Sequence, residues 1–511
     1  MVKRAAAGTT GRMDVQAKMI LGAGALALLT AAAPPEEAAI TFRPVSENGA
    51  VAAIDVTMTL EIDGALKLDA PIVYPGAPGT ADRMRNITVT DKEGAVPLTI
   101  SEDPPVPGGF PYFRHWQANR PVSGPVRVTW RALVTAPGGA GGPAFGIRAV
   151  DRGVVGAGST LLLLPDRPSI ATTRVHWDLS GLPSGSIAAM SHGDGDLVLS
   201  GPPSQLTQSW FMAGPLGRFP AAGQSDGFSA YWLGTPTFDA PAEMAWTARA
   251  HSYLAQHFPH LKPTQPYRVF LQFREQPPFG GATALHQSFM LARGPLREGE
   301  ERAAPRLTLF HEMIHMWVGG IEAPVGVSSW FSEGLTTYYQ NLLPMKGGFI
   351  SLDDYGREIN ELAESYYTNK ARNWSAEAIT KVGFTDEEIR HLPYRRSALY
   401  FADLDARIRA ASKGKRDLET LLFPMFLARE RGETFDQARW IAMVTAELGP
   451  QEKARFQRLI LDGADTIEPR SDAFGPCFRR EAATFTRDGK AVAGYRWVRA
   501  AGVADERCIE R

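Results

Sequence analysis

The stretch LFHEMIHMW, residues 309–317, places two histidines one helical turn apart inside an apolar run. On a helix, His311 and His315 share a face, so both imidazoles can converge on one metal ion. Glu312 lies about 100° around such a helix, beside a bound metal, where it can take a proton from a water molecule. The HExxH spacing therefore predicts a catalytic zinc site. The alternative is a core helix that contains two satisfied histidines.

A catalytic zinc needs a third protein ligand and an open position for water. The metzincin arrangement requires glycine at position 318 and histidine at position 321, and the chain has Val318 and Ile321 there, which excludes that class. Glu333, in the stretch SSWFSEGLTTYY of the next expected helix, is the candidate third ligand. Glu322 is the rival, but it follows a pair of glycines that are expected to end the first helix.

Composition describes a globular chain without an obvious polyanionic partner. The 511 residues carry 54 basic and 55 acidic side chains, a formal net charge of −1, and no long run of either sign. A nucleic-acid-binding chain usually concentrates positive charge on one face or segment. We therefore expect no nucleic acid partner.

The pattern along the chain predicts a multidomain α+β fold. Strict alternation in IDVTMTLEI and VRVTWRALV, separated by Gly- and Pro-rich breaks, predicts an N-terminal antiparallel β-sandwich over residues 39–175. A mixed linker and the β part of a catalytic domain follow over 176–304, with one helix expected near 241–258 and strands in YRVFLQF and ATALHQSFML. Helical spacing then dominates residues 305–465. The expected helices lie in RLTLFHEMIHMWV, SWFSEGLTTYYQNLL, YRRSALYFADLDARIRAAS, LETLLFPMFLARER and FDQARWIAMVTAEL.

The first residues are typical of an export signal. Residues 1–33 combine a basic start, an apolar stretch and a small-residue end, which predicts a secretory signal peptide. The alternative is an unstructured apolar N-terminus. No later stretch reaches the ~20 apolar residues that a membrane-spanning helix needs. We expect a periplasmic or secreted protein without a spanning segment in the mature chain.

The only two cysteines, Cys477 and Cys508, both lie in the expected C-terminal tail, residues 466–511. In an oxidising compartment such a pair predicts a disulfide that closes the tail. Two free buried thiols are the alternative.

The segments HEMIHMW, WFSEGLTTYY and LPYRRSALYFADLDARIR together resemble the gluzincin zinc metallopeptidases. The resemblance is to the glycyl aminopeptidase family in particular, which is related to the aminopeptidase N family. It implies a thermolysin-like catalytic domain made of a small sheet and a helical half. It further implies the following roles: His311, His315 and Glu333 as Zn²⁺ ligands, Glu312 as general base, and Tyr394 as the hydroxyl that stabilises the oxyanion.

The chain departs from these families at several positions. Arg395 and Arg396 follow the tyrosine in place of a Lys-Gly pair, and the chain ends too soon for the PDZ domain that many glycyl aminopeptidases carry. Leu285 stands where relatives carry a glutamate that grips the free amine of the substrate. The next residue, His286, is a candidate substrate-binding residue, although a histidine in a core strand is more often structural.

These observations lead to one expected function and two alternatives. We expect an exported, aminopeptidase-like zinc peptidase that acts on peptides. Because Leu285 replaces the amine-binding glutamate, an endopeptidase or another zinc hydrolase is the first alternative. A non-catalytic binding protein on a peptidase scaffold is the second. The sequence does not indicate the oligomeric state.

Overall fold

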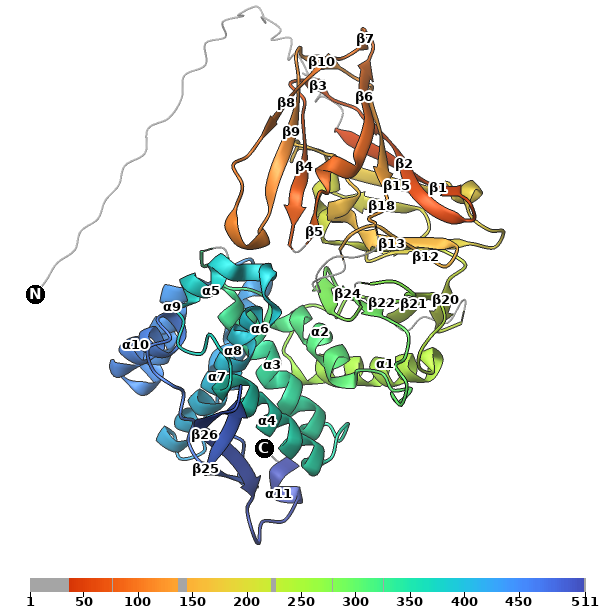
Figure 1. Ribbon diagram of the computed structural model, residues 1–511. Helices are drawn as coiled ribbons and strands as arrows, with labels where there is room; N and C mark the ends of the chain where they lie inside the picture. The colour runs from red at the N-terminus through yellow and green to blue at the C-terminus, as the bar shows by residue number, and fades with distance from the viewer. Residues whose placement is uncertain are drawn as a thin grey trace, which may run out of the picture. The chain divides into compact units, whose positions relative to one another are not determined.

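The computed structural model describes residues 36–75, 77–136, 145–221, 227–277, 279–324 and 326–509 (Figure 1). The signal peptide expected over residues 1–33 lies outside these ranges. Within them, no helix is both long and apolar enough to cross a membrane.

The N-terminal part is built from β-sheets around one apolar core. The alternating residues expected to face inward, among them Ile54, Val56, Val126 and Trp130, are at most 2% exposed. A seven-stranded sheet has the order β18 (Leu197–Ser200), β15 (Thr172–Trp177), β1 (Glu37–Glu47), β2 (Ala50–Leu60), β11 (Val126–Leu133), β6 (Met84–Asp91), β7 (Gly94–Ala95). A second sheet has the order β14 (Leu164–Pro165), β4 (Lys67–Tyr74), β9 (Tyr112–Ala118), β8 (Leu98–Glu102).

The β-rich part continues beyond the boundary expected at residue 175, which falls inside β15. That strand pairs with β1 in parallel, and β18 follows beside it. A third sheet has the order β12 (Arg148–Val150), β13 (Gly153–Ala157), β19 (Trp210–Gly214), β16 (Ile187–Met190), β17 (Gly193–Asp194). The local pattern did not reveal these strands because β13 and β19 are buried on both faces and do not alternate.

The next sheet is the one that reaches the candidate site. Its order is β20 (Gly217–Phe219), β21 (Phe228–Leu233), β22 (Tyr267–Phe273), β24 (Ser288–Arg293), β23 (Ala282–Leu285). The stretch ATALHQSFML, expected as one strand, is a hairpin of β23 and β24, and Gln287 in its turn has φ +46°. The expectation of a single strand was wrong because both arms are apolar and the turn lacks glycine.

Side chains on the two faces of this sheet enter different cores. Val269 and Leu271 of β22 pack with helices α1 (Ala240–His257) and α2 (Arg306–Val318). Phe270, between them in sequence, packs instead with Trp210 and Met212 of β19. The sheet is therefore covered by helices on one face and by the third β-sheet on the other.

The helical part follows the expected pattern and adds helices that the sequence did not predict. The expected helix over 306–318 is α2, and the later predictions correspond to α3 (Ser329–Lys346), α7 (Leu392–Ala411), α8 (Glu419–Glu430) and α9 (Gln437–Leu448). The additional helices include α4 (Leu352–Tyr367), α5 (Ala376–Val382), α6 (Glu387–Arg390) and α10 (Gln451–Phe456).

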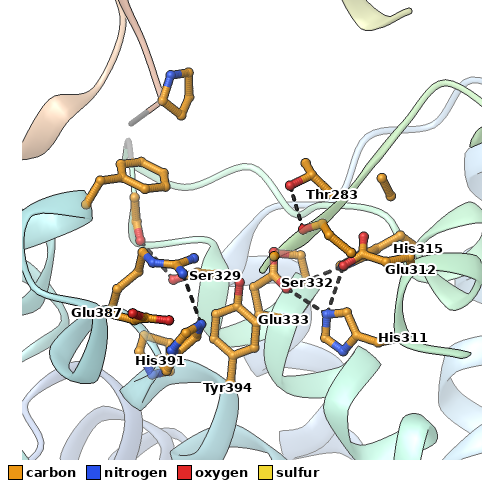
Figure 2. A pocket seen from close by; sticks show the side chains of 18 of the residues that line it. Thr283, His311, Glu312, His315, Ser329, Ser332, Glu333, Glu387, His391 and Tyr394 are labelled. Atoms are coloured by element: carbon orange, nitrogen blue, oxygen red, sulfur yellow. Dashed lines mark hydrogen bonds and ion pairs between the residues drawn. The ribbon is translucent and has the colours of Figure 1, made fainter. Parts of the chain in front are cut away.

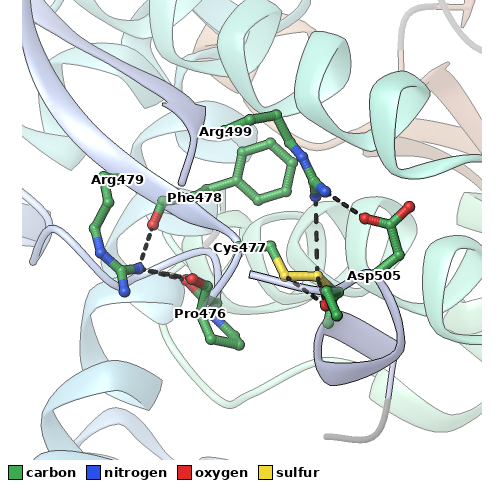
Figure 3. The surroundings of a disulfide bond; sticks show 9 residues. Pro476, Cys477, Phe478, Arg479, Arg499 and Asp505 are labelled. Carbon is green, nitrogen blue, oxygen red and sulfur yellow. Dashed lines mark hydrogen bonds and ion pairs between the residues drawn. A yellow bond between two sulfur atoms is a disulfide. The ribbon is translucent and has the colours of Figure 1, made fainter. Parts of the chain in front are cut away.

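The C-terminal tail is a hairpin closed by the expected disulfide between Cys477 and Cys508 (Figure 3). The hairpin strands are β25 (Phe478–Arg487) and β26 (Lys490–Arg499), and the short helix α11 (Glu506–Ile509) follows. Asn360 of α4 bonds to the backbone of Trp497 in both directions, at 2.8 and 2.9 Å. These bonds and the buried indole of Trp497 attach the tail to the helical part.

Candidate active site

Helix α2 carries the two histidines and ends shortly after them. His311 and His315 lie on one face, and their Nε2 atoms are 3.2 Å apart. The helix stops at Gly319, whose φ of +57° disfavours a residue with a side chain. The histidines therefore sit in the last turns of a short helix, and the opposite face of that helix is buried in the core.

Helix α3 brings a carboxylate to the same point. The Oε2 atom of Glu333 lies 3.2 Å from Nε2 of His311 and 3.3 Å from Nε2 of His315. The donor atoms of the three residues all lie within 4.8 Å of one another. Figure 2 shows the three side chains pointing toward one another at the cavity. Glu322, the rival ligand, is not in this group and pairs through its backbone with the segment before α9.

The donor set fits zinc. Two imidazole nitrogens and one carboxylate oxygen are ligands that zinc takes in catalytic sites. Burial by itself would raise the pKa of Glu333, but the adjacent His315 and His311 hold that pKa well below its usual range. Glu333 is therefore ionised, which a metal-ligating carboxylate must be.

Two further side chains hold the imidazoles from behind. Nδ1 of His311 lies 2.9 Å from Oε1 of Gln340, and Nδ1 of His315 lies 3.4 Å from the hydroxyl of Thr336. An Nδ1–H bond to Gln340 leaves the Nε2 lone pair of His311 free for a metal. Neither residue was predicted from the sequence. The signal was available, since Gln340 lies two helical turns beyond Glu333 and so on the same face of α3.

Glu312 lies next to this group and is 6% exposed. Burial raises its pKa to about 7, although the positive character of His311 and a hydrogen bond with the backbone of Ala284 act in the opposite direction. Ala284 belongs to β23, so the edge strand of the sheet contacts the carboxylate directly. Figure 2 shows Thr283, another residue of β23, beside Glu312.

Tyr394 stands on the opposite helix, α7, which begins with Leu392 and Pro393. Its ring stacks on that of His311 with centroids 5.8 Å apart. Burial, and the charge of Glu333 beside it, raise the pKa of the phenol, so the hydroxyl keeps its proton and can donate it in a hydrogen bond.

Glycine allows α3 and α7 to approach closely at this point. A Cβ on Gly334 would lie 2.2 Å from Cβ of Ser397 on α7. Any larger residue would push the two helices apart, and with them the residues that α3 and α7 contribute, Glu333 and Tyr394. The glycine after Glu333 is therefore part of how the site is assembled.

A cavity of about 1000 Å³ is lined by the proposed ligands His311, His315 and Glu333, and by Glu312 and Tyr394. The N-terminal β-rich part contributes a wall, because Phe110 packs on Phe384 with ring centroids 5.6 Å apart. Gly108, at φ +79°, makes this contact possible, since a Cβ there would lie 2.5 Å from the backbone oxygen of Thr380. The cavity is thus lined by segments far apart in the sequence.

The structure does not place His286 among the residues that line the cavity. His286 lies in the turn between β23 and β24 and stacks on His192, with centroids 4.9 Å apart. Leu285, by contrast, does line the cavity. The lining carboxylates among the described residues are Glu312, Glu333 and Glu387, so β23 presents none.

Comparison with known proteins agrees with this geometry. Residues 306–391 match the family model of the M61 glycyl aminopeptidases. No curated protein sequence matches the chain. Among solved structures, an aminopeptidase N family protein from Idiomarina loihiensis is similar with a TM-score of 0.65 and 15% identity, over 89% of this chain and 81% of that one. An M1 zinc metallopeptidase mutant from Deinococcus radiodurans, bound to a Tyr-Ser-Ala substrate, is similar with a TM-score of 0.51 and 18% identity, over 85% and 94% of the two chains.

The solved structures establish the fold, which is the two-domain architecture of M1-type aminopeptidases: a β-rich domain followed by a helical catalytic part. The family match over residues 306–391 and the His–His–Glu group support a zinc metallopeptidase, and the chain resembles the gluzincins. Within that class, the segment that carries the site resembles the M61 glycyl aminopeptidases.

Proposed function

We propose that the chain is an exported peptidase that hydrolyses peptide bonds at a zinc ion held by His311, His315 and Glu333. The convergence of their three donor atoms within 4.8 Å is the observation that supports this most directly. When bound, zinc supplies Lewis-acid chemistry: it polarises a carbonyl group and makes a water molecule more acidic.

Glu312 is the proposed general base. Its carboxylate follows the ligand His311 directly and lies at the same cavity, within reach of a water molecule that attacks the scissile carbonyl. It would take a proton from that water and pass the proton to the departing amine. The backbone of Ala284, on β23, lies next to this carboxylate.

Tyr394 is the proposed oxyanion donor. Its protonated hydroxyl lies across the cavity from α2 and carries no charge of its own. A donor fixed in this way stabilises the negative charge that develops on the carbonyl oxygen. The stack on His311 keeps the ring in place.

We propose aminopeptidase-like action first, because the family match and the similar fold both belong to aminopeptidases. Leu285 is the observation that favours the alternative, an endopeptidase or another hydrolase without free-amine recognition. The two can be separated with matched peptides that differ only in N-terminal acetylation. Faster cleavage of the free-amine peptide supports an aminopeptidase, and equal or faster cleavage of the acetylated one supports the alternative.

The proposal of export, to the periplasm or outside the cell, rests on the sequence of residues 1–33 and is supported by the disulfide. Cell fractionation followed by mass spectrometry of the N-terminus would test it. A mature chain that begins near residue 34 in an exported fraction is expected. An unprocessed chain in the cytoplasm would contradict export without affecting the proposed chemistry.

The experiment that tests the catalytic proposal compares wild type with Glu312→Gln. Both are expected to bind about one zinc per chain, because Glu312 is not a ligand. The variant is expected to lose roughly 10²–10⁴-fold in kcat, the range for loss of general acid–base catalysis. Zinc-loaded wild type that cleaves no peptide in a diverse library would instead favour the non-catalytic binding protein.

A further inference from the structure

A second set of charged groups lines the cavity away from the zinc ligands. Arg390, at the end of α6, and Arg395, on α7, both face it. Both are partly buried, and neither forms an ion pair with a described residue, although the charges of Glu388 and Glu387 act on Arg395 and Glu387 lines the same cavity. Partly buried arginines normally have an anionic partner, because desolvating the charge is costly. These two present positive charge to the cavity instead.

His391 holds the guanidinium of Arg390 in place. Nη2 of Arg390 lies 3.1 Å from Nε2 of His391. Burial and the two neighbouring arginines lower the pKa of His391 to about 3, so the imidazole is neutral and its nitrogen accepts the hydrogen bond. Arg390 donates one N–H in this bond, so its other N–H groups can donate to a ligand.

The guanidinium also rests against an aromatic wall. It lies over the ring of Phe384, 5.8 Å from the centroid, and Phe384 packs in turn on Phe110. This wall restricts water on one side of the charge and strengthens its interaction with an anion on the other side.

A chain of contacts connects the guanidinium to the zinc site. The ring of Tyr394 lies 5.8 Å from that of His311 and 5.1 Å from that of His391, which contacts Arg390. Figure 2 shows His391 and Glu387 on one side of Tyr394, and Thr283 and Glu312 on the other. A peptide bound at the zinc site along β23 would therefore extend toward Arg390.

We propose that Arg390, with Arg395 adding positive charge, binds a carboxylate of the peptide substrate. This inference rests on the proposed function and specifies its substrate class: peptides that carry a carboxylate beyond the scissile bond, either the C-terminal carboxylate or an acidic side chain. A planar guanidinium with free N–H groups matches a carboxylate in geometry and in charge. Selectivity then comes from a carboxylate of the peptide, which Arg390 binds. The relatives instead use a carboxylate of the protein to bind the free amine of the substrate.

The test uses two pairs of matched peptides. One pair has a free or an amidated C-terminus, and the other has Asp or Asn at a single position with the C-terminus amidated. Peptide binding is measured by calorimetry on zinc-loaded Glu312→Gln protein, and kcat/KM is measured on active protein. We expect at least one carboxylate peptide to bind roughly tenfold or more tightly than its neutral partner. The pair that shows the difference identifies which carboxylate is recognised.

Three substitutions complete the test. Arg390→Gln is expected to remove the preference, and Arg390→Glu to reverse it in favour of a matched lysine peptide. Arg152→Gln, an exposed arginine in the β-rich part with a side chain 61% exposed, is the control and keeps the wild-type preference. Zinc content is measured in each variant.

The outcomes separate this inference from the proposed function. Equal affinity for both members of both pairs, or a preference that survives Arg390→Gln, would overturn the anion subsite even if peptides are cleaved. A preference that Arg390→Gln removes, without turnover of any peptide, would keep the subsite and reject the peptidase.

Discussion

Nε2 of His311 and Oε2 of Glu333 lie 3.2 Å apart, although the two residues belong to different helices. Because two histidines alone give an incomplete site, we expect Glu333→Ala to bind zinc much more weakly or not at all. Elemental analysis of purified wild type and variant measures this. The matched control is Glu322→Ala, which is expected to keep about one zinc per chain. Loss of zinc in Glu322→Ala and retention in Glu333→Ala would reassign the third ligand.

A second prediction concerns the residue behind His311. Gln340→Ala removes the acceptor that orients the imidazole, and such changes weaken metal affinity by about 10–100-fold. Competition with a zinc chelator measures the affinity. Gln340→Glu is expected to retain tight binding, because it preserves an acceptor at the same position. Equal affinity in wild type and Gln340→Ala would show that the bond does not act on the metal site.

A third prediction concerns Tyr394. Tyr394→Phe keeps the ring that stacks on His311 but removes the hydroxyl, so zinc content and KM are expected to remain close to wild type. We expect kcat to fall by roughly 10²–10³-fold, the range for loss of one oxyanion donor. Steady-state kinetics separates the two parameters. A change confined to KM would assign the hydroxyl to ground-state binding instead.

A fourth prediction concerns stability and pH. His251 is 7% exposed and stacks on Tyr267, and its Nε2 has no hydrogen-bond partner in the part of the chain that the structure describes. Burial lowers its pKa from 6.5 to about 4. The unfolded chain therefore binds a proton more readily than the folded one, so stability falls as pH drops below 6.5, and this loss is complete below about 4.

We expect His251→Phe to remove this dependence. Between pH 8 and pH 5, wild type should lose about 2 kcal/mol more unfolding free energy than the variant. Chemical denaturation at the two pH values measures the difference, and His260→Gln, a change at an exposed histidine, serves as the control. Parallel pH profiles for wild type and His251→Phe would contradict a buried neutral histidine.

The sequence predicted the parts of the site that depend on local spacing. His311, Glu312 and His315 follow from one helical turn, and the pattern around Glu333 indicated a second helix. The structure brings these residues and Tyr394 together at one cavity. Their catalytic and ligand roles remain predictions until the experiments above are done.

The sequence could not predict what depends on tertiary packing. His286 follows directly after Leu285, which lines the cavity. The tight turn between β23 and β24 nevertheless places His286 against His192 and outside the cavity lining. Arg390 and Phe110 meet through Phe384 only because distant segments fold together. The extension of the β-rich part past residue 175 depends on the pairing of β15 with β1, which no local pattern reveals.

The core shared by β19 and β22 has a consequence for how the protein unfolds. Trp210 and Met212 from the β-rich part and Phe270 from the catalytic sheet are all fully buried in one cluster. Separating the two parts would expose these large apolar side chains to water, at about 25 cal/mol for each Å². We therefore expect the two parts to melt cooperatively, as a single calorimetric transition, and neither to be a module that can be exchanged between proteins without redesign of this interface.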